Sequence, residues 1–325
     1  MLVLLLSLAL AGCSVAEQAT PLNPKGSVGE DQLFLIQLSL GIMTFVLVVV
    51  FVIFFYVIIR YRQRRGQTGI PKQVEGSHKL EITWTVIPLI LLTILAVPTV
   101  QKTFALAKDY SEANDVLKVK VTGHQFWWEF EYTDLGIVTS GDLYIPVGQK
   151  VFVTVQSADV AHSFWVPGLA GKIDAIPGVT NKMYFDAKEP GVYRGACAEL
   201  CGASHALMDF KVIAVSEDEF EQWVEDMQTP VAESDAVRGQ ELFEAKGCLQ
   251  CHAITPDGKS MGPNLNNFAN RDRVASFRPN TEEWLAKWLD DPQEVKPGST
   301  MPDVGLTQDE IDALVEYLYS LDNQQ

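Results

Sequence analysis

Apolar residues are concentrated in the first third of the 325-residue chain, in two long runs that contain no charged side chain. The runs cover residues 33–59 and residues 82–100. A helix needs about 20 residues to cross the apolar core of a bilayer, and membrane helices tolerate proline within them. We predict transmembrane helices at residues 30–62 and 80–107. Buried helices of a soluble core are the alternative, but the charged loop between the two runs argues against them.

That loop, predicted at residues 63–79, is strongly basic. The charges in and next to it are Arg60, Arg62, Arg64, Arg65, Glu75, Lys72 and Lys79. Positively charged loops stay on the cytoplasmic side of a membrane, so both ends of the chain should face outward.

The N-terminus carries a possible export signal. Residues 1–12 are apolar and end in small residues directly before Cys13, which is typical of a signal peptide. The segment Leu10–Cys13 resembles a bacterial lipobox, which implies cleavage before Cys13 and a lipid on its sulfur. A plain signal peptide or a misassigned start codon is the alternative, because residues 1–12 contain no Lys or Arg. A lipid at Cys13, followed by an exported linker at residues 13–29, agrees with a periplasmic N-terminus on a bacterial inner membrane.

From about residue 116 the spacing of apolar residues changes to a period of two. Valine or leucine occupies alternate positions in residues 117–121 and 151–155, and further β-rich stretches cover residues 179–185 and 210–215. Turns that contain glycine and proline separate these stretches. Short alternating strands of this kind predict an all-β sandwich or barrel over residues 108–215.

Metal-ligating side chains gather near the end of this β-rich region, at Cys197, Cys201, His205 and Met208, with His162 in an earlier stretch. Thiolate, thioether and imidazole together favour copper over zinc, because methionine is a poor zinc ligand. Two thiolates shared by two copper ions would give each ion a sulfur-rich set with one histidine, which suits electron transfer. A disulfide between the cysteines and a structural role for His162 are the alternatives.

The spacing C-x-E-x-C-x-x-x-H-x-x-M of residues 197–208, together with His162, resembles the binuclear copper A site of cytochrome c oxidase subunit II. The resemblance extends from residue 30 to about residue 215 and implies a cupredoxin β-barrel. Asp174 to Gly178 also matches the family, although Val179 stands where the family has arginine.

The resemblance implies a specific role for each residue of the copper motif. Cys197 and Cys201 would bridge the copper ions, His162 and His205 would each bind one, Met208 would be a weak ligand, and Glu199 would bind through its carbonyl. The carboxylate of Glu199 would reach a magnesium ion shared with subunit I.

Two further positions carry over from the family. Glu81 matches an acidic residue at the mouth of a proton channel, and the alternative is an interfacial charge at a helix end. Phe126 stands where many members have a tryptophan that receives electrons from cytochrome c. Trp127 and Trp128 follow it, either as part of the electron path or as core of the β domain.

The last part of the chain contains the attachment signal of a c-type haem. Residues 216–233 are acidic and polar and predict a connecting segment. In residues 234–325, Cys248, Cys251 and His252 form C-x-x-C-H, which predicts two thioether bonds and a proximal histidine. A redox-active disulfide is the alternative.

The residues around this motif resemble a small all-α class I cytochrome c domain. Gly262 to Leu265 resembles the loop that braces the proximal histidine in that family. Met301, before a predicted helix at residues 308–321, is the candidate distal ligand, and a distal methionine raises the redox potential. Met261 competes with it but is close in sequence to His252.

Together the resemblances imply a multi-domain chain: a two-helix transmembrane hairpin, an all-β cupredoxin barrel and an all-α cytochrome c domain. The implied function is that of subunit II of a respiratory haem–copper cytochrome c oxidase. Such a chain takes electrons from a cytochrome c-type donor through haem c and copper A and passes them to subunit I. There oxygen is reduced to water and protons are pumped, and subunit III is a further expected partner.

Composition and the remaining histidines limit this interpretation. The net charge of −16 argues against nucleic acid as a partner and is compatible with a basic protein donor. His78 and His124 do not cluster with other ligands in the sequence, so no catalytic residue for oxygen reduction is expected in this chain. The alternatives are the copper A and cytochrome c subunit of a nitric oxide reductase, or a stand-alone membrane-tethered electron carrier.

Overall fold

The computed structural model describes residues 20–66, 68–70, 73, 75–230 and 235–323 of the chain. The predicted signal peptide and Cys13 therefore lie outside the described residues. The chain divides into two compact units: residues 31–108 form one, and residues 109–325 with the segment before Asp31 form the other.

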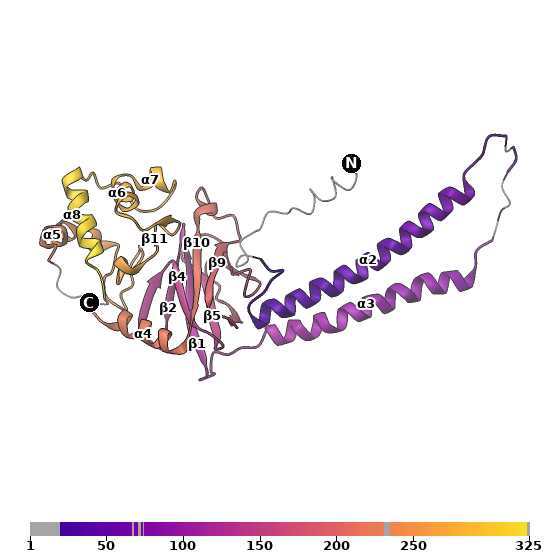
Figure 1. Cartoon of the computed structure of the whole chain (residues 1–325), viewed down its shortest axis with the longest axis horizontal. Helices are drawn as coiled ribbons and strands as arrows, with labels where there is room; N and C mark the ends of the chain where they lie inside the picture. The colour runs from indigo at the N-terminus through magenta and orange to yellow at the C-terminus, as the bar shows by residue number, and fades with distance from the viewer. Residues whose placement is uncertain (1–19, 67, 71–72, 74, 231–234, 324–325) are drawn as a thin grey trace. The chain divides into compact units, whose positions relative to one another are not determined.

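The first unit is a pair of long helices, α2 (Ser27–Tyr61) and α3 (His78–Leu106). Both are long and apolar enough to cross a membrane, and the most apolar 18-residue window of each contains no buried residue. They lie side by side as a hairpin (Figure 1), and Lys102 of α3 forms an ion pair with Asp31 of α2. Each helix begins and ends within three residues of the predicted bounds. An apolar exterior of this length is stable in lipid rather than in water.

The second unit begins with a β domain of two five-stranded sheets. One sheet has the order β3-β2-β1-β5-β8, with β1 at Val116–His124, β2 at Trp127–Tyr132, β3 at Ile137–Ser140, β5 at Lys150–Ser157 and β8 at Asn181–Phe185. The other has the order β4-β10-β9-β6-β7, with β4 at Asp142–Pro146, β6 at His162–Trp165, β7 at Lys172–Ala175, β9 at Gly191–Cys197 and β10 at Asp209–Val215. The predicted all-β domain is confirmed.

An aromatic core lies between the inner faces of the two sheets. Trp128, Phe130, Phe164 and Phe210 are all fully buried, and the rings of Phe164 and Phe210 stack with centroids 4.8 Å apart. Trp128 also lies edge-on to Phe164 and Phe210. Buried aromatic rings of this size contribute most of the apolar surface of such a core. The core thereby fixes the start of β6, where His162 lies.

The β domain is followed by helices, which Figure 1 shows in orange to yellow. A connecting helix, α4, spans Glu217–Gln228 and begins with a capping box between Ser216 and Glu219. The helices of the last domain are α5 (Val237–Ala245), α6 (Glu282–Asp290), α7 (Pro292–Val295) and α8 (Gln308–Tyr319). A two-residue strand pair, β11 (Arg273–Val274) and β12 (Arg278–Pro279), adds a small hairpin to the all-α domain predicted from the sequence.

Helices α5 and α8 pack closely at a buried glycine. A Cβ atom on Gly239 would lie 2.1 Å from the carbonyl oxygen of Ala313, so only glycine fits without displacing one helix. We expect Gly239→Ala to lower the free energy of unfolding of the last domain by about 1–3 kcal/mol, because overpacked cores cost that much. Denaturant titration of the haem absorbance would measure it. Gln240→Ala, at the exposed neighbouring position, should cause little change.

Candidate functional site

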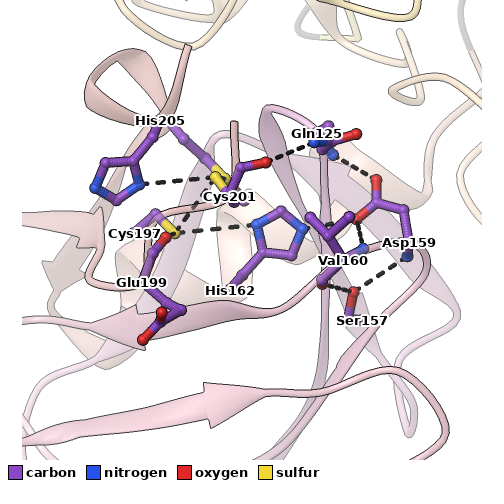
Figure 2. Close-up of polar contacts among 10 residues, drawn as sticks. Gln125, Ser157, Asp159, Val160, His162, Cys197, Glu199, Cys201 and His205 are labelled. Carbon is purple, nitrogen blue, oxygen red and sulfur yellow. Dashed lines mark hydrogen bonds and ion pairs between the residues drawn. The ribbon is translucent and has the colours of Figure 1, made fainter. Parts of the chain in front are cut away.

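Five of the residues predicted to bind copper lie close together in the β domain, and Figure 2 shows them: His162, Cys197, Glu199, Cys201 and His205. Antiparallel pairing places Phe164 of β6 opposite Cys197 of β9, which brings the start of β6 next to the cysteine. His162 Nδ1 lies 4.0 Å from Cys197 Sγ, and His205 Nδ1 lies 3.7 Å from Cys201 Sγ. His162 and Cys197 are 35 positions apart in the sequence and are neighbours in the fold.

The remaining members of the predicted set complete the cluster. The two Sγ atoms are 3.9 Å apart, which is too long for a disulfide, and both cysteines are free. Met208 Sδ lies 3.8 Å from Cys201 Sγ, and the carbonyl oxygen of Glu199 lies 3.2 Å from Cys197 Sγ. One histidine stands beside each sulfur, so the donors fit two metal ions that share two thiolates.

The two thiols differ in acidity although they are close together. Burial would raise the pKa of Cys197, but hydrogen bonds to His162 and to backbone groups outweigh it, and the net shift is downward. Burial and the neighbouring Cys197 thiolate raise the pKa of Cys201. Burial opposes the charge on His162, yet its hydrogen bonds with Cys197 and Asp159 raise its pKa. In the copper-free chain, Cys197 is therefore the thiol that ionises more easily, whereas Cys201 and His162 hold their protons more strongly.

Copper binding should therefore become tighter as the pH rises. Copper has to displace the proton of Cys201 and the proton on His162, and below the lowered pKa of Cys197 a third proton as well. A proton that is displaced across the whole range changes the apparent affinity about tenfold per pH unit, so the Cys201 proton alone contributes about 100-fold between pH 6 and pH 8. His162 and Cys197 add to this wherever they are still protonated. Competition with a chelator on the copper-free chain would measure this, and a pH-independent affinity would contradict it.

Two polar residues that the sequence did not single out hold the cluster in place. His162 is fully buried, and its Nε2 lies 2.7 Å from Asp159 Oδ1. Asp159 also accepts a hydrogen bond from the backbone N–H of Gln125, whose side-chain amide donates to the carbonyl oxygen of Cys201. A carboxylate on the far nitrogen fixes the orientation of a metal-binding imidazole.

Removal of that carboxylate should weaken copper retention. We expect Asp159→Asn to lower the copper affinity about 10- to 100-fold, the usual effect of losing such an outer partner. Dialysis against a chelator, followed by copper analysis, would measure the loss. Asp134→Asn, on a largely exposed side chain of the same domain, is the matched control and should retain copper.

The haem-attachment motif lies at the mouth of a cavity in the last domain. Cys248 begins a short 3-10 helix, and His252 follows it with its Nδ1 2.8 Å from the carbonyl oxygen of Pro263. That contact leaves the other ring nitrogen to face the cavity. A Cβ atom on Gly262 would lie 2.8 Å from His252 Cε1, so glycine is required beside the imidazole. The bracing loop predicted from the sequence lies where it was expected.

The cavity has a volume of about 530 Å³ and is lined mainly by apolar side chains. Cys248, Cys251, His252 and Met301 all line it, so this donor set suits a covalently attached haem with one histidine and one methionine ligand. Met261 lines the cavity too, but its side chain is 73% exposed. The exposure of Met261 favours Met301 as the distal ligand.

The other predicted positions lie in different surroundings. Glu81 is in the first turn of α3, with Oε2 3.3 Å from His78 Nδ1. Trp127 and Trp128 are both buried in the β domain, and Trp128 lies edge-on to His162 with ring centroids 5.9 Å apart. Phe126 is buried as well, and together with Trp127 it lines the cavity of the last domain.

Comparisons with known proteins agree with this geometry. The family model of the cytochrome c oxidase subunit II transmembrane domain matches residues 24–101, that of the subunit II periplasmic domain matches residues 137–215, and that of cytochrome c matches residues 236–322. Cytochrome c oxidase subunit 2 of Alkalihalophilus pseudofirmus is 47% identical over 97% of this chain and 94% of its own. The same subunit of Bacillus subtilis is 45% identical over 99% of this chain and 96% of its own.

A membrane hairpin, a β domain with a cysteine-rich metal cluster and a haem-attachment domain define an electron-transfer subunit of a respiratory enzyme. The chain belongs to the cytochrome c oxidase subunit II family, in the form that carries its own cytochrome c domain. It is a two-pass membrane protein whose domains imply copper A and haem c, and other oxidase subunits are its partners. The nitric oxide reductase and stand-alone alternatives are not favoured.

Proposed function

We propose that this chain takes electrons from a cytochrome c-type donor at its last domain and delivers them from its β domain to subunit I. The convergence of two cysteines, two histidines, a methionine and a backbone carbonyl on one buried point carries this proposal. When bound, copper A and haem c each supply a one-electron carrier that changes little in geometry. The chain itself holds both groups, excludes water from their sites and keeps the two sites close to each other.

In the last domain, Cys248 and Cys251 would hold the haem covalently, and His252 and Met301 would bind its iron. The carbonyl oxygen of Pro263 accepts the Nδ1–H of His252 and so selects the tautomer that can bind iron through Nε2. Met301 lies beyond α7, and the segment 299–302 that contains it lines the cavity.

In the β domain, Cys197 and Cys201 would hold the two copper ions together with His162 and His205. Met208 is a weak ligand, and Glu199 binds through its carbonyl oxygen. The carboxylate of Glu199 points away from the sulfurs in Figure 2 and is exposed. It is therefore available to a magnesium ion shared with subunit I.

The membrane arrangement follows from the basic loop and the two spans. We place the loop in the cytoplasm, both metal domains on the periplasmic side, and Glu81 at the mouth of a proton channel near the cytoplasmic surface. Cleavage before Cys13 and its lipidation belong to the same proposal, as does subunit III as a further partner. Phe126, Trp127 and Trp128 are the proposed electron path. Phe126 and Trp127 line the haem cavity and Trp128 lies edge-on to His162, which supports this assignment.

Rapid mixing of the oxidised oxidase complex with a reduced soluble cytochrome c tests the order of these steps. The haem c band should be reduced first and the copper A band second, followed by oxygen consumption. Reduction of copper before haem would overturn the proposed direction. Consumption of nitric oxide in place of oxygen would favour the reductase alternative, and purification of the chain without any partner would favour a stand-alone carrier.

A further inference from the structure

The last domain contacts the β domain at a buried lysine. Lys296 follows α7 and is 3% exposed. Its Nζ donates to the carbonyl oxygen of Phe126 in the β domain and to that of Ala275 in the last domain, both at 2.7 Å. A buried amino group requires hydrogen-bond acceptors, and here each domain supplies one. The lysine therefore links the two domains at one point.

The acceptor in the last domain, the carbonyl oxygen of Ala275, lies in a tight turn. Ala275 and Ser276 form the turn between β11 and β12, with φ of 52° and 72°. Two consecutive positive φ values are those of a tight hairpin turn that usually contains Asn and Gly, and other residues adopt them at a cost. The ring of Phe277 lies 5.6 Å from Lys296 Nζ. The turn directs the Ala275 carbonyl at the lysine.

The segment that follows Lys296 also packs against the loop between β9 and β10, which carries the predicted copper ligands. Ser204, next to His205, donates through Oγ to the carbonyl oxygen of Pro297 at 2.7 Å. A Cβ atom on Gly298 would lie 3.4 Å from Ala203 Cβ and 3.5 Å from Phe126 Cε2, which are contact distances. Residues 296–298 thus pack on both the Phe126 loop and the loop of the copper ligands, three to five residues before Met301.

Further contacts extend this interface along the edge of the β domain. They are Val138 N to Pro256 O at 2.8 Å, Lys259 to Glu131 at 2.6 Å, Arg271 Nη1 to Ser140 Oγ at 2.9 Å and Lys211 to Asp272 at 2.5 Å. The cavity itself has residues 124–127 of the β domain among its lining. Contacts of this number and spread suit a fixed interface better than a brief encounter between tethered domains.

We propose that the haem domain is permanently seated on the copper domain and that Lys296 is the positioning residue that fixes this seat beside Phe126. The inference rests on the proposed function and deepens it. A fixed seat brings the segment that leads to Met301 against the loop that carries Cys201 and His205. Electron transfer between the domains then requires no domain movement, and the aromatic ring of Phe126 lies inside the interface, away from a soluble donor.

The test compares Lys296→Met with Lys287→Met in the full chain within the oxidase complex. Methionine keeps the apolar stem of Lys296 and removes its hydrogen bonds to Phe126 and Ala275. Lys287 is half exposed and contacts Glu283 and the Trp284 ring on its own helix. Hydrogen–deuterium exchange should accelerate about tenfold or more at residues 124–127 and 202–205 of the copper domain in Lys296→Met alone. Transfer from haem to copper should slow about tenfold or more, because small displacements have large effects on such rates.

Two outcomes would overturn the inference. If Lys296→Met accelerates exchange only around Ala275, the lysine belongs to the core of the last domain and does not hold the interface. If no Lys296 variant folds, pulsed EPR on the unaltered complex decides, since a fixed seat gives one narrow haem-to-copper distance and a mobile domain gives a broad one. Failure of the proposed function is distinct, because then the unaltered chain would show no haem-to-copper transfer.

Discussion

Cys201→Ser should abolish the mixed-valence EPR signal of copper A and lower oxygen consumption by the oxidase at least about 100-fold, since even outer partners of a metal ligand are worth 10- to 100-fold. Cys201 has the central place in the cluster. Its Sγ lies 3.9 Å from Cys197 Sγ, 3.7 Å from His205 Nδ1 and 3.8 Å from Met208 Sδ. Serine offers a hard oxygen donor that does not ionise at neutral pH, so neither ion would retain two shared sulfurs.

The matched control for that variant is Leu200→Ser, which introduces the same side chain one position earlier. Leu200 is 78% exposed and makes no part of the cluster. Its copper signal should be unchanged, while haem c should still be reduced by the soluble donor in both variants. A Cys201→Ser chain that retained a multi-line copper signal would contradict the bridging role.

Loss of both haem-attaching cysteines, in Cys248→Ala with Cys251→Ala, should unfold the last domain and leave the copper domain folded. The haem cavity of about 530 Å³ would be left unfilled, and a cavity costs about 24 cal/mol per Å³. The product is about 13 kcal/mol, which matches the whole stability of an ordinary domain at about 5–15 kcal/mol. The apolar core around Phe243, Leu285 and Leu314 cannot carry that cost.

Hydrogen–deuterium exchange of α5, α6 and α8 would measure this unfolding, and the copper A EPR signal would report on the β domain. Gln250→Ala is the control, because Gln250 is exposed between the two cysteines and its loss should leave the haem attached. Protected amides in α8 of the haem-free chain would contradict the prediction. Oxygen consumption with a soluble donor should fall with haem content.

The parts of the fold that the sequence predicted are those that depend on local spacing. Helices α2 and α3 begin and end close to their predicted bounds, and Leu117, Val119 and Val121 of β1 are buried as their period of two required. Four of the copper-binding candidates fall within twelve residues, so one loop can gather them wherever the loop lies in the fold.

The parts that were missed depend on contacts between distant segments. The parallel pairing of β1 with β5 and the place of β10 between β4 and β9 have no local signal. Nothing in the sequence distinguishes Lys296 from a surface lysine, because its partner Phe126 is 170 positions away. Asp159 offered a weak signal, three residues before His162, because carboxylates often orient metal-binding histidines.

The position of the copper loop has a consequence for the biogenesis of the enzyme. Residues 198–208 connect β9 to β10, and β10 has to insert between β9 and β4 before that connection takes its shape. Strand β4 lies about 70 residues earlier, so this pairing forms late, as long-range and parallel contacts do. Metallation therefore waits until the β domain has closed, and a copper donor has to recognise a folded, metal-free surface rather than an emerging chain.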